Sequence, residues 1–319
     1  ERGLANGIMF SSTHAGYFLG GSGALWMKGR LDGNFEAAAA VIVVLMAMIF
    51  TCVILFVSEK SAAQQMADGE IPAPKPGDHG IKVIADQLID YFSTIWSSVI
   101  CTRNGILTLL LAITPIGALA LSMLLSGLIA PKIGMSDDQL AALNLVSTLV
   151  WIAACLLGGW LSDKFGRRLI FALSASMTIL PSIWVAALFK AAGWSHPPAV
   201  SADGSWPYEA ELITAWWIAI LAFSVFSGGS YGVKNAFYMD VVNPKIAATQ
   251  FTALMAMTNM TNGWAKLWMS QAFDHEKGWE WPIWRLLYVD AAIGLGFLLI
   301  LYFIKPVSKK SEPPGPMET

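Results

Sequence analysis

The sequence predicts an all-α polytopic membrane protein, and three observations carry that prediction. Hydrophobic residues make up 55% of the 319-residue chain and charged residues 13%, about half the charged share of a soluble domain. Apolar stretches recur that are each close to the ~20 residues a helix needs to cross a bilayer. Lys and Arg residues gather in alternate loops between these stretches. The stretches run near 7–27, 36–57, 104–130, 140–161, 168–190, 211–233, 247–271 and 283–304.

The basic residues orient the predicted spans. With residues 163–168 on the cytoplasmic side, the inside loops hold roughly twice as many Lys and Arg residues as the outside loops, as the positive-inside rule requires. Both ends of the chain are then predicted to be cytoplasmic. The net charge of -2 gives no electrostatic basis for binding nucleic acid. The three cysteines match no metal-binding or redox spacing, so we expect no metal and no cofactor.

Residues 159–168, Gly-Trp-Leu-Ser-Asp-Lys-Phe-Gly-Arg-Arg, form a short loop of mixed charge between two predicted spans. Asp163 ends one helix, where it can accept hydrogen bonds from the N-terminal amides of the next. The arginines can pair with carboxylates or carbonyls, and the glycines permit a sharp turn. Such a charged lock can gate two conformations; the alternative is a plain positive-inside hairpin. The predicted gating residues are Gly159, Asp163, Lys164, Gly166, Arg167 and Arg168.

The spacing G-x-L-S-D-K-x-G-R-R resembles the signature loop of the major facilitator superfamily of transporters. The resemblance implies a major facilitator fold of twelve helices in two bundles, with this loop between the second and third helix of a bundle. Residues 104–304 would then form the six-helix C-terminal bundle and residues 1–57 the last two helices of the N-terminal bundle. We therefore expect the chain to hold the last eight of twelve helices and to lack four N-terminal ones.

Residues 58–103 are predicted to be a cytoplasmic linker between the bundles, and residues 305–319 a cytoplasmic tail. The middle of the linker, GEIPAPKPGDHG, is rich in Pro and Gly and is expected to be irregular. Residues 81–96 instead show helical periodicity, with apolar residues on one side. This pattern predicts an amphipathic helix, either along the membrane surface or packed on the protein's own cytoplasmic face.

Two further segments resemble one branch of the superfamily, which holds the AmpG-like muropeptide permeases and the acetyl-coenzyme A transporters. They are the first span, with Arg2-Gly3 and Gly16-Tyr17, and residues 248–251, Ala-Thr-Gln-Phe, before the penultimate span. Phe18 stands where that branch has an Arg. The resemblance implies a small polar substrate, such as a cell-wall fragment containing sugar or peptide, and a place in the bacterial inner membrane.

Ionisable and polar groups inside the spans are the candidates for substrate binding or proton coupling, because an unpaired charge in hydrocarbon is costly. The run SVFSGGSYGVKN ends in Lys234 and Asn235, and its glycines and serines predict a broken helix of the kind that binds substrates in transporters. Asn259, Asn262 and Lys266 share one face of the penultimate span. The other candidates are His14, Tyr17 and Asp290.

Each candidate also has a structural interpretation. His14 and the two asparagines can bind neighbouring helices together, and the lysines can extend toward the membrane surface. Asp290 can form a structural pair with a group on another helix.

The sequence thus predicts a secondary active transporter that moves a small polar solute by alternating access. The resemblance implies proton coupling, for which His14 or Asp290 would carry the proton. Expected partners are the solute, protons and the lipid bilayer, with the protein acting as a monomer. Two other classes stay open. A membrane-embedded transferase would need His, Asp or Glu residues clustered at one membrane face, and a non-transporting scaffold or sensor would be marked by a large soluble domain.

Overall fold

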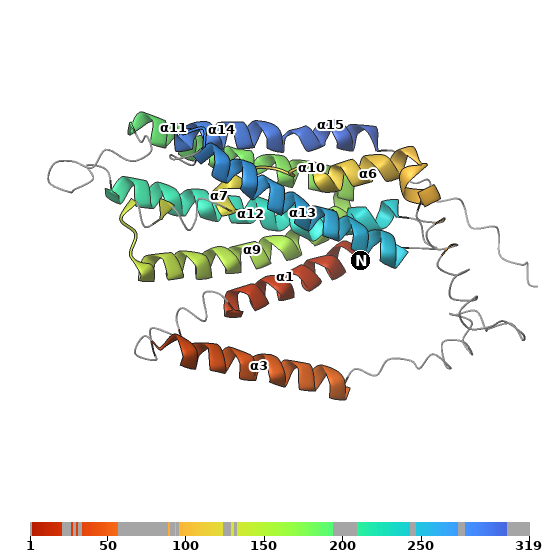
Figure 1. The fold of residues 1–319 in the computed structure, drawn as a ribbon, viewed down its shortest axis with the longest axis horizontal. Coiled ribbons are helices and arrows are strands. Elements are labelled where there is room, and N and C mark those ends of the chain that lie inside the picture. Colours follow the sequence, from red (N-terminus) through yellow and green to blue (C-terminus); the bar gives the residue numbers. More distant parts are fainter. Residues whose placement is uncertain are drawn as a thin grey trace, which may run out of the picture. The chain divides into compact units, whose positions relative to one another are not determined.

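The computed structural model describes residues 2–20, 27, 30, 34–56, 89, 93, 96–123, 129–130, 133–193, 209–242, 247–273 and 278–304. Every regular element in these ranges is a helix (Figure 1), and the predicted all-α polytopic membrane fold is confirmed. The chain falls into two compact units, residues 16–96 and residues 1–15 with 97–319. Apart from a few single residues, the predicted linker helix at 81–96 lies outside the described residues, as does the tail.

The first unit, residues 1–15 with 97–319, contains most of the helices, and the second unit, residues 16–96, contains α3 (Phe35–Phe56). A π-helical turn at Trp96–Ile100 precedes the larger group. The helices of the first unit are α1 (Arg2–Gly20, of which the last turn belongs to the second unit), α6 (Arg103–Ile113), α7 (Ala120–Met123), α9 (Asp137–Phe165), α10 (Arg167–Met177), α11 (Ile179–Ala191), α12 (Glu209–Val241), α13 (Ala247–Phe273), α14 (Ile283–Gly294) and α15 (Gly296–Phe303).

Five stretches of the described residues are long and apolar enough to cross a membrane: Ala39–Phe56, Asp138–Phe165, Arg167–Ala191, Ala210–Val241 and Ile283–Phe303. Helices α1 and α13 coincide with predicted spans but are less apolar, and α13 carries several Thr and Asn residues. Large apolar side chains on α9, α11 and α15 are exposed, including Leu149, Leu157, Leu180 and Leu299. Exposed apolar faces of this kind suit contact with lipid rather than water.

The hairpin predicted at residues 159–168 forms a turn of a single residue between α9 and α10. Helix α9 begins with a complete capping box, in which Ser136 and Gln139 exchange side-chain and backbone hydrogen bonds. It ends at Gly166, whose φ of 98° lies in the region that glycine enters freely. Arg167 then starts α10 at once. Gly159 takes no part in the turn, because it lies within α9.

Three predicted spans are each split into two helices, and the splits meet one another. Gly117 lies between α6 and α7, Thr178 between α10 and α11, and Gly294 ends α14. The Gly117 N–H donates to the Gly294 carbonyl at 3.1 Å, and the Ala118 N–H donates to Thr178 Oγ1 at 2.9 Å. Backbone groups freed inside a bundle must find such partners on neighbouring helices. We call these four residues the break cluster.

The broken helix predicted over residues 224–235 is not observed, because α12 is continuous from Glu209 to Val241. Its glycines serve close packing instead. A Cβ atom on Gly228 would collide with the Trp151 carbonyl oxygen of α9, and one on Gly232 with the Cys155 carbonyl oxygen. Small residues at such spacing let two membrane helices approach closely. The helix breaks that the structure does contain lie in other spans, at the break cluster.

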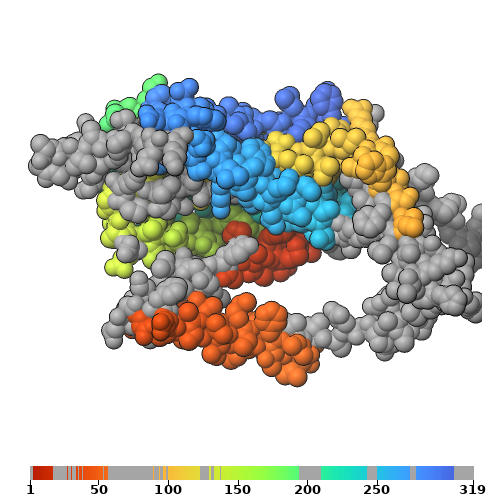
Figure 2. Space-filling model, viewed as in Figure 1, coloured from red at the N-terminus to blue at the C-terminus, as the bar shows by residue number. Residues whose placement is uncertain are grey.

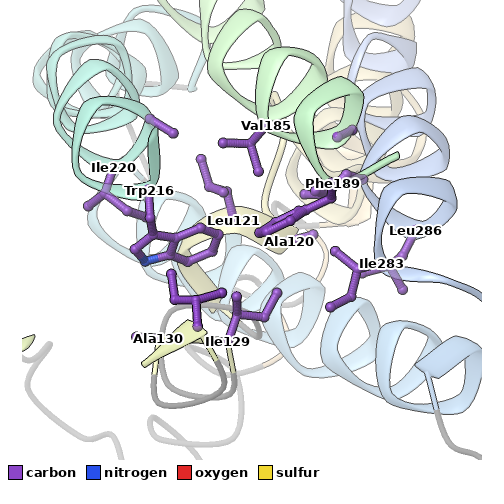
Figure 3. Packing of buried hydrophobic residues seen from close by; sticks show 14 of the residues in the cluster. Ala120, Leu121, Ile129, Ala130, Val185, Phe189, Trp216, Ile220, Ile283 and Leu286 are labelled. Atoms are coloured by element: carbon purple, nitrogen blue, oxygen red, sulfur yellow. The ribbon is translucent and has the colours of Figure 1, made fainter. Parts of the chain in front are cut away.

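The larger hydrophobic core joins α7, α11, α12 and α14. Figure 3 shows the Trp216 and Ile220 side chains of α12 beside Val185 and Phe189 of α11, with Ile283 of α14 nearby. Trp216 is fully buried. At the other end of the unit, α6 lies against α13 and α15, where the space-filling view shows yellow and blue surfaces in contact (Figure 2). The larger hydrophobic core forms one wall of the cavity described below, because Ile220 belongs both to this core and to the lining of the cavity.

Candidate functional site

A cavity of about 240 Å³ lies between α1, α7, α9 and α12. This volume is just below the ~300 Å³ at which sites for drug-sized ligands begin, so it suits a small solute. Its described lining holds no Asp, Glu, Lys or Arg side chain. Hydroxyl and amide groups come from Ser122, Asn144, Ser147, Thr148, Ser224 and Ser227, apolar groups from Ile220 and Phe223, and rings from His14, Trp151 and Tyr231. We call it the central pocket.

Three aromatic rings form one end of the central pocket. The His14 imidazole stacks on the Trp151 indole with a centroid distance of 3.3 Å and an interplanar angle of 11°. Tyr231 meets Trp151 at 5.5 Å and His14 edge-on at 6.1 Å. The Trp151 Nε1–H donates to Ser227 Oγ at 3.4 Å, which fixes the indole against α12. The pocket therefore offers ring faces beside hydroxyl groups.

Helical periodicity brings the polar lining together. Asn144, Ser147 and Trp151 recur at three and four residues along α9, and Ser224, Ser227 and Tyr231 do the same along α12. Residues at this spacing lie on one face of a helix. Neither stripe was predicted from the sequence, because neither contains an ionised side chain that would be costly in the membrane. The signal was present as polar residues at helical spacing inside two apolar spans.

Of the candidates predicted from the sequence, the structure places His14 in the central pocket and Lys234 beside it. Lys234 is only 4% exposed, and its Nζ lies 4.1 Å from the centroid of the Tyr231 ring. A cation over an aromatic face is a favourable contact. Within the described ranges Lys234 forms no ion pair.

The other candidates do not line the central pocket. Asn235 is fully buried in α12, and no described residue hydrogen-bonds its amide. On α13, Asn259 and Lys266 are exposed and Asn262 is half-buried, away from the buried face of that helix. The backbone of Tyr17 lies in α1, and its side chain is outside the described part of the chain.

Asp290 is fully buried and binds the backbone at the start of α7. Its Oδ2 accepts hydrogen bonds from the Leu119 and Ala120 N–H groups, both at 2.8 Å. Its Oδ1 has no hydrogen-bond partner among the described residues. Ser122, two residues beyond Ala120, lines the central pocket. Asp290 thus holds a pocket-lining segment in place without lining the pocket itself.

The end of α6 is held by α13 in a similar way. Thr261 Oγ1 donates to the Ala112 carbonyl at 2.8 Å, and the Trp264 Nε1–H donates to the Ile113 carbonyl at 3.1 Å. These carbonyls lie at the C-terminal end of α6, where the helix offers them no amide. Side chains from neighbouring helices therefore satisfy both sides of the break between α6 and α7.

Asp163, at the end of α9, accepts hydrogen bonds from α1. Oδ1 accepts from the Gly3 N–H and Oδ2 from the Leu4 N–H, both at 3.1 Å. The sequence had predicted the first amides of α10 as its partners; these two hydrogen bonds come from α1. A carboxylate at a helix N-terminus satisfies amides that have no partner within the helix. Asp163 therefore fastens α1 to α9.

The two arginines of the loop bind other helices of the same unit. Arg167 Nη1 contacts both carboxylate oxygens of Asp240 on α12, at 2.5 and 2.6 Å, and its Nη2 lies 3.2 Å from Asp163 Oδ1. Arg168 donates to the carbonyls of Leu301, Tyr302 and Ile304 at the end of α15.

The other two loop residues predicted to gate lie nearby. Lys164 Nζ lies 5.3 Å from the centroid of the Trp160 ring. Gly159 packs so closely on α1 that a Cβ atom there would meet the Gly3 carbonyl oxygen. The loop thus connects α9 and α10 to α1, α12 and α15.

A polar pocket inside a bundle whose outer faces are apolar suits a transporter, in which solutes bind between helices. A family model described as "Sugar (and other) transporter" matches residues 85–312. The chain belongs to this family of major facilitator transporters, which are secondary transporters of sugars or similar solutes. Searches of curated proteins and of solved structures found no match.

Proposed function

We propose that the protein is a secondary active transporter of neutral, hydroxyl-rich solutes, with the central pocket as its binding site. The observation that carries this proposal is the lining, in which hydroxyl and amide groups lie beside ring faces and no carboxylate, ammonium or guanidinium group is described. A sugar presents hydroxyl groups at its rim and C–H groups on its faces, so both parts of the lining find a partner. The resemblance of residues 248–251 to AmpG-like permeases adds cell-wall sugars to the test panel.

The proposal is tested by exchange of radiolabelled D-glucose, maltose and N-acetylglucosamine in proteoliposomes. We expect saturable exchange of at least one sugar and an increase in KM of about tenfold in Trp151→Leu, because an aromatic platform is lost. Trp160→Leu is the matched control, since Trp160 lies on the same helix but is 49% exposed and outside the pocket. No exchange of any sugar would overturn the proposal, as would equal KM changes in the two variants.

We propose that transport is coupled to protons, carried by His14 or Asp290. His14 lines the central pocket, and Asp290 keeps one carboxylate oxygen without a described partner. In the same vesicles, sugar-driven proton uptake is expected to disappear in His14→Gln or in Asp290→Asn while sugar exchange continues. Unchanged proton uptake in both variants would contradict this assignment.

We propose that Asp163, Arg167 and Asp240 form the lock that the loop was predicted to supply, at the cytoplasmic end of the bundle. Arg167 joins two carboxylates on two helices, so any movement of α9 and α10 against α12 must break these contacts. Side chains in this network are about one-fifth to two-fifths exposed, and exposed pairs contribute little stability. The network can therefore open at small cost.

Arg167→Ala is expected to lower the unfolding free energy by about 1 kcal/mol or less and to slow sugar exchange, because the locked conformation is lost. Arg167→Lys is expected to restore only part of the rate, since lysine has a single nitrogen where Arg167 uses two, Nη1 on Asp240 and Nη2 on Asp163. Lys164→Ala, which removes a charge in the same loop but no described ion pair, is the control. Equal exchange rates in Arg167→Ala and Lys164→Ala would exclude the lock.

A further inference from the structure

Helices α1 and α9 run antiparallel and touch through a series of contacts that ends at the central pocket. A Cβ atom on Gly3 would collide with the Gly159 carbonyl oxygen, and one on Gly7 would lie 3.0 Å from the Cys155 carbonyl oxygen. Further along, Ser11 Oγ donates to the Ile152 carbonyl at 3.3 Å. We call these contacts, together with the stack of His14 on Trp151, the α1–α9 seam.

The contacts at the pocket end of the seam are of another type than those along the rest of it. Near Asp163 the two backbones meet directly, and the Cys155 thiol donates to the Gly7 carbonyl at 3.6 Å. At the pocket the two helices meet through ring faces, with His14 flat on Trp151. A face-to-face sandwich is a less favourable arrangement of two aromatic rings than an offset or edge-on one. The stack is therefore the contact of the seam that a ligand can most readily replace.

His14 occupies the ring face that a sugar in the pocket would use. The two rings are nearly parallel at 3.3 Å, which leaves no space for a ligand between them. Both residues line the pocket, and Trp151 is held in place by Ser227 and is only 6% exposed. His14 is half-buried and belongs to the other helix. A solute that stacks on this face of Trp151 must move His14, and with it the end of α1.

We propose that binding of a neutral sugar displaces His14 from Trp151 and opens the pocket end of the α1–α9 seam. The stack then links occupancy of the pocket to separation of the two helices, while Asp163 holds their other end. The ligand in this inference rests on the proposed function. The claim that the stack keeps the seam closed does not depend on the proposed function. The role of the stack and the displacement by sugar can therefore be tested separately.

Cys155 reports the state of the seam, because it is buried there and the other two cysteines, Cys52 and Cys101, are exposed. In a Cys52→Ser, Cys101→Ser background, the rate of Cys155 labelling by N-ethylmaleimide is measured on the full chain in detergent without sugar. We expect His14→Ala and Trp151→Ala each to raise this rate by about two- to tenfold, the range that loss of one aromatic contact supplies. The variant with both substitutions should label at Cys155 little faster than either single variant, because both remove the same contact.

Thr13→Ala is the matched control, since Thr13 is exposed and its one hydrogen bond among the described residues is to the Met9 carbonyl of its own helix. Its labelling rate should equal that of the background. A change in Thr13→Ala as large as in His14→Ala would mean that α1 is simply loosened, and no change in either ring variant would show that the stack does not close the seam. Each result would overturn the inference.

The second measurement adds D-glucose, maltose or N-acetylglucosamine. A sugar that exchanges is expected to speed Cys155 labelling in the background and to have no further effect in His14→Ala. Slower labelling with that sugar would overturn the displacement. If no sugar exchanges, the proposed function fails and displacement by sugar fails with it, while labelling of His14→Ala without sugar still decides the role of the stack.

Discussion

Replacing Asp290 by alanine is expected to destabilise the bundle by about 2–4 kcal/mol, because two buried backbone donors lose their acceptor. The Leu119 and Ala120 N–H groups both bind Asp290 Oδ2 at 2.8 Å, at a break where their own helix offers no carbonyl. Ala120 and Asp290 are completely buried, so water cannot take the place of the carboxylate without opening the core. The loss should appear as a lower midpoint of thermal unfolding in detergent.

Asp290→Asn separates the capping role from the charge. The asparagine carbonyl can accept both hydrogen bonds, so this variant should retain most of the stability that Asp290→Ala loses. Because Ser122 follows the capped segment and lines the pocket, Asp290→Ala should also weaken sugar binding. Equal unfolding midpoints for Asp290→Ala and the unaltered protein would show that Leu119 and Ala120 find other acceptors, and would exclude the capping role.

The sequence was sufficient to predict which class of fold forms and where most helices lie. Hydropathy depends on the chain alone, and the predicted stretch 140–161 lies within α9 just as 211–233 lies within α12. The capping box that starts α9 is also local, because Ser136 and Gln139 are three residues apart in the chain. These features depend on residues close together in the chain.

The helix breaks could not be predicted in the same way. The glycines at 228 and 232 predicted a broken helix, yet α12 is continuous there. These positions are glycine because the backbone of α9 leaves no space for a side chain. The span containing Thr178 has no glycine at its break, and its local sign is Pro181 in the first turn of α11. The proline does not tell which helix holds the break, which is paired with that at Gly117 through the hydrogen bond from Ala118. Whether a glycine breaks a helix or packs against another depends on the neighbouring helix, which a single sequence does not reveal.

The candidate site was predicted in part. The ionisable residues in the spans include His14, which lines the pocket, and Lys234, which contacts Tyr231. Trp151 and the hydroxyl groups were missed, because the described pocket lining contains no Asp, Glu, Lys or Arg residue to mark it. Asp163 was identified as a helix-capping residue, but its partner proved to be α1, more than 150 residues away in the chain. Long-range pairing of this kind is set by the packing of helices.

Gly158→Ala is expected to destabilise the protein by about 1–3 kcal/mol, the usual range for overpacking a tight interface. A Cβ atom at Gly158 would lie 2.5 Å from the Gly229 carbonyl oxygen and 2.6 Å from its Cα. Both are backbone atoms, so no side chain can turn aside and α9 must move away from α12. These two helices carry most of the pocket lining, and sugar exchange should therefore fall along with the unfolding midpoint.

Gly263→Ala is the control, because its stability is expected to stay equal or rise where that of Gly158→Ala falls. Gly263 lies within α13, and a Cβ atom there would meet nothing within 4 Å. Alanine is more favourable than glycine inside a helix by about 1 kcal/mol, so this variant should unfold at the same temperature or higher. The same substitution thus raises stability on an open helix face and lowers it where two backbones touch. Equal shifts of the unfolding midpoint in Gly158→Ala and Gly263→Ala would contradict the direct backbone contact between α9 and α12.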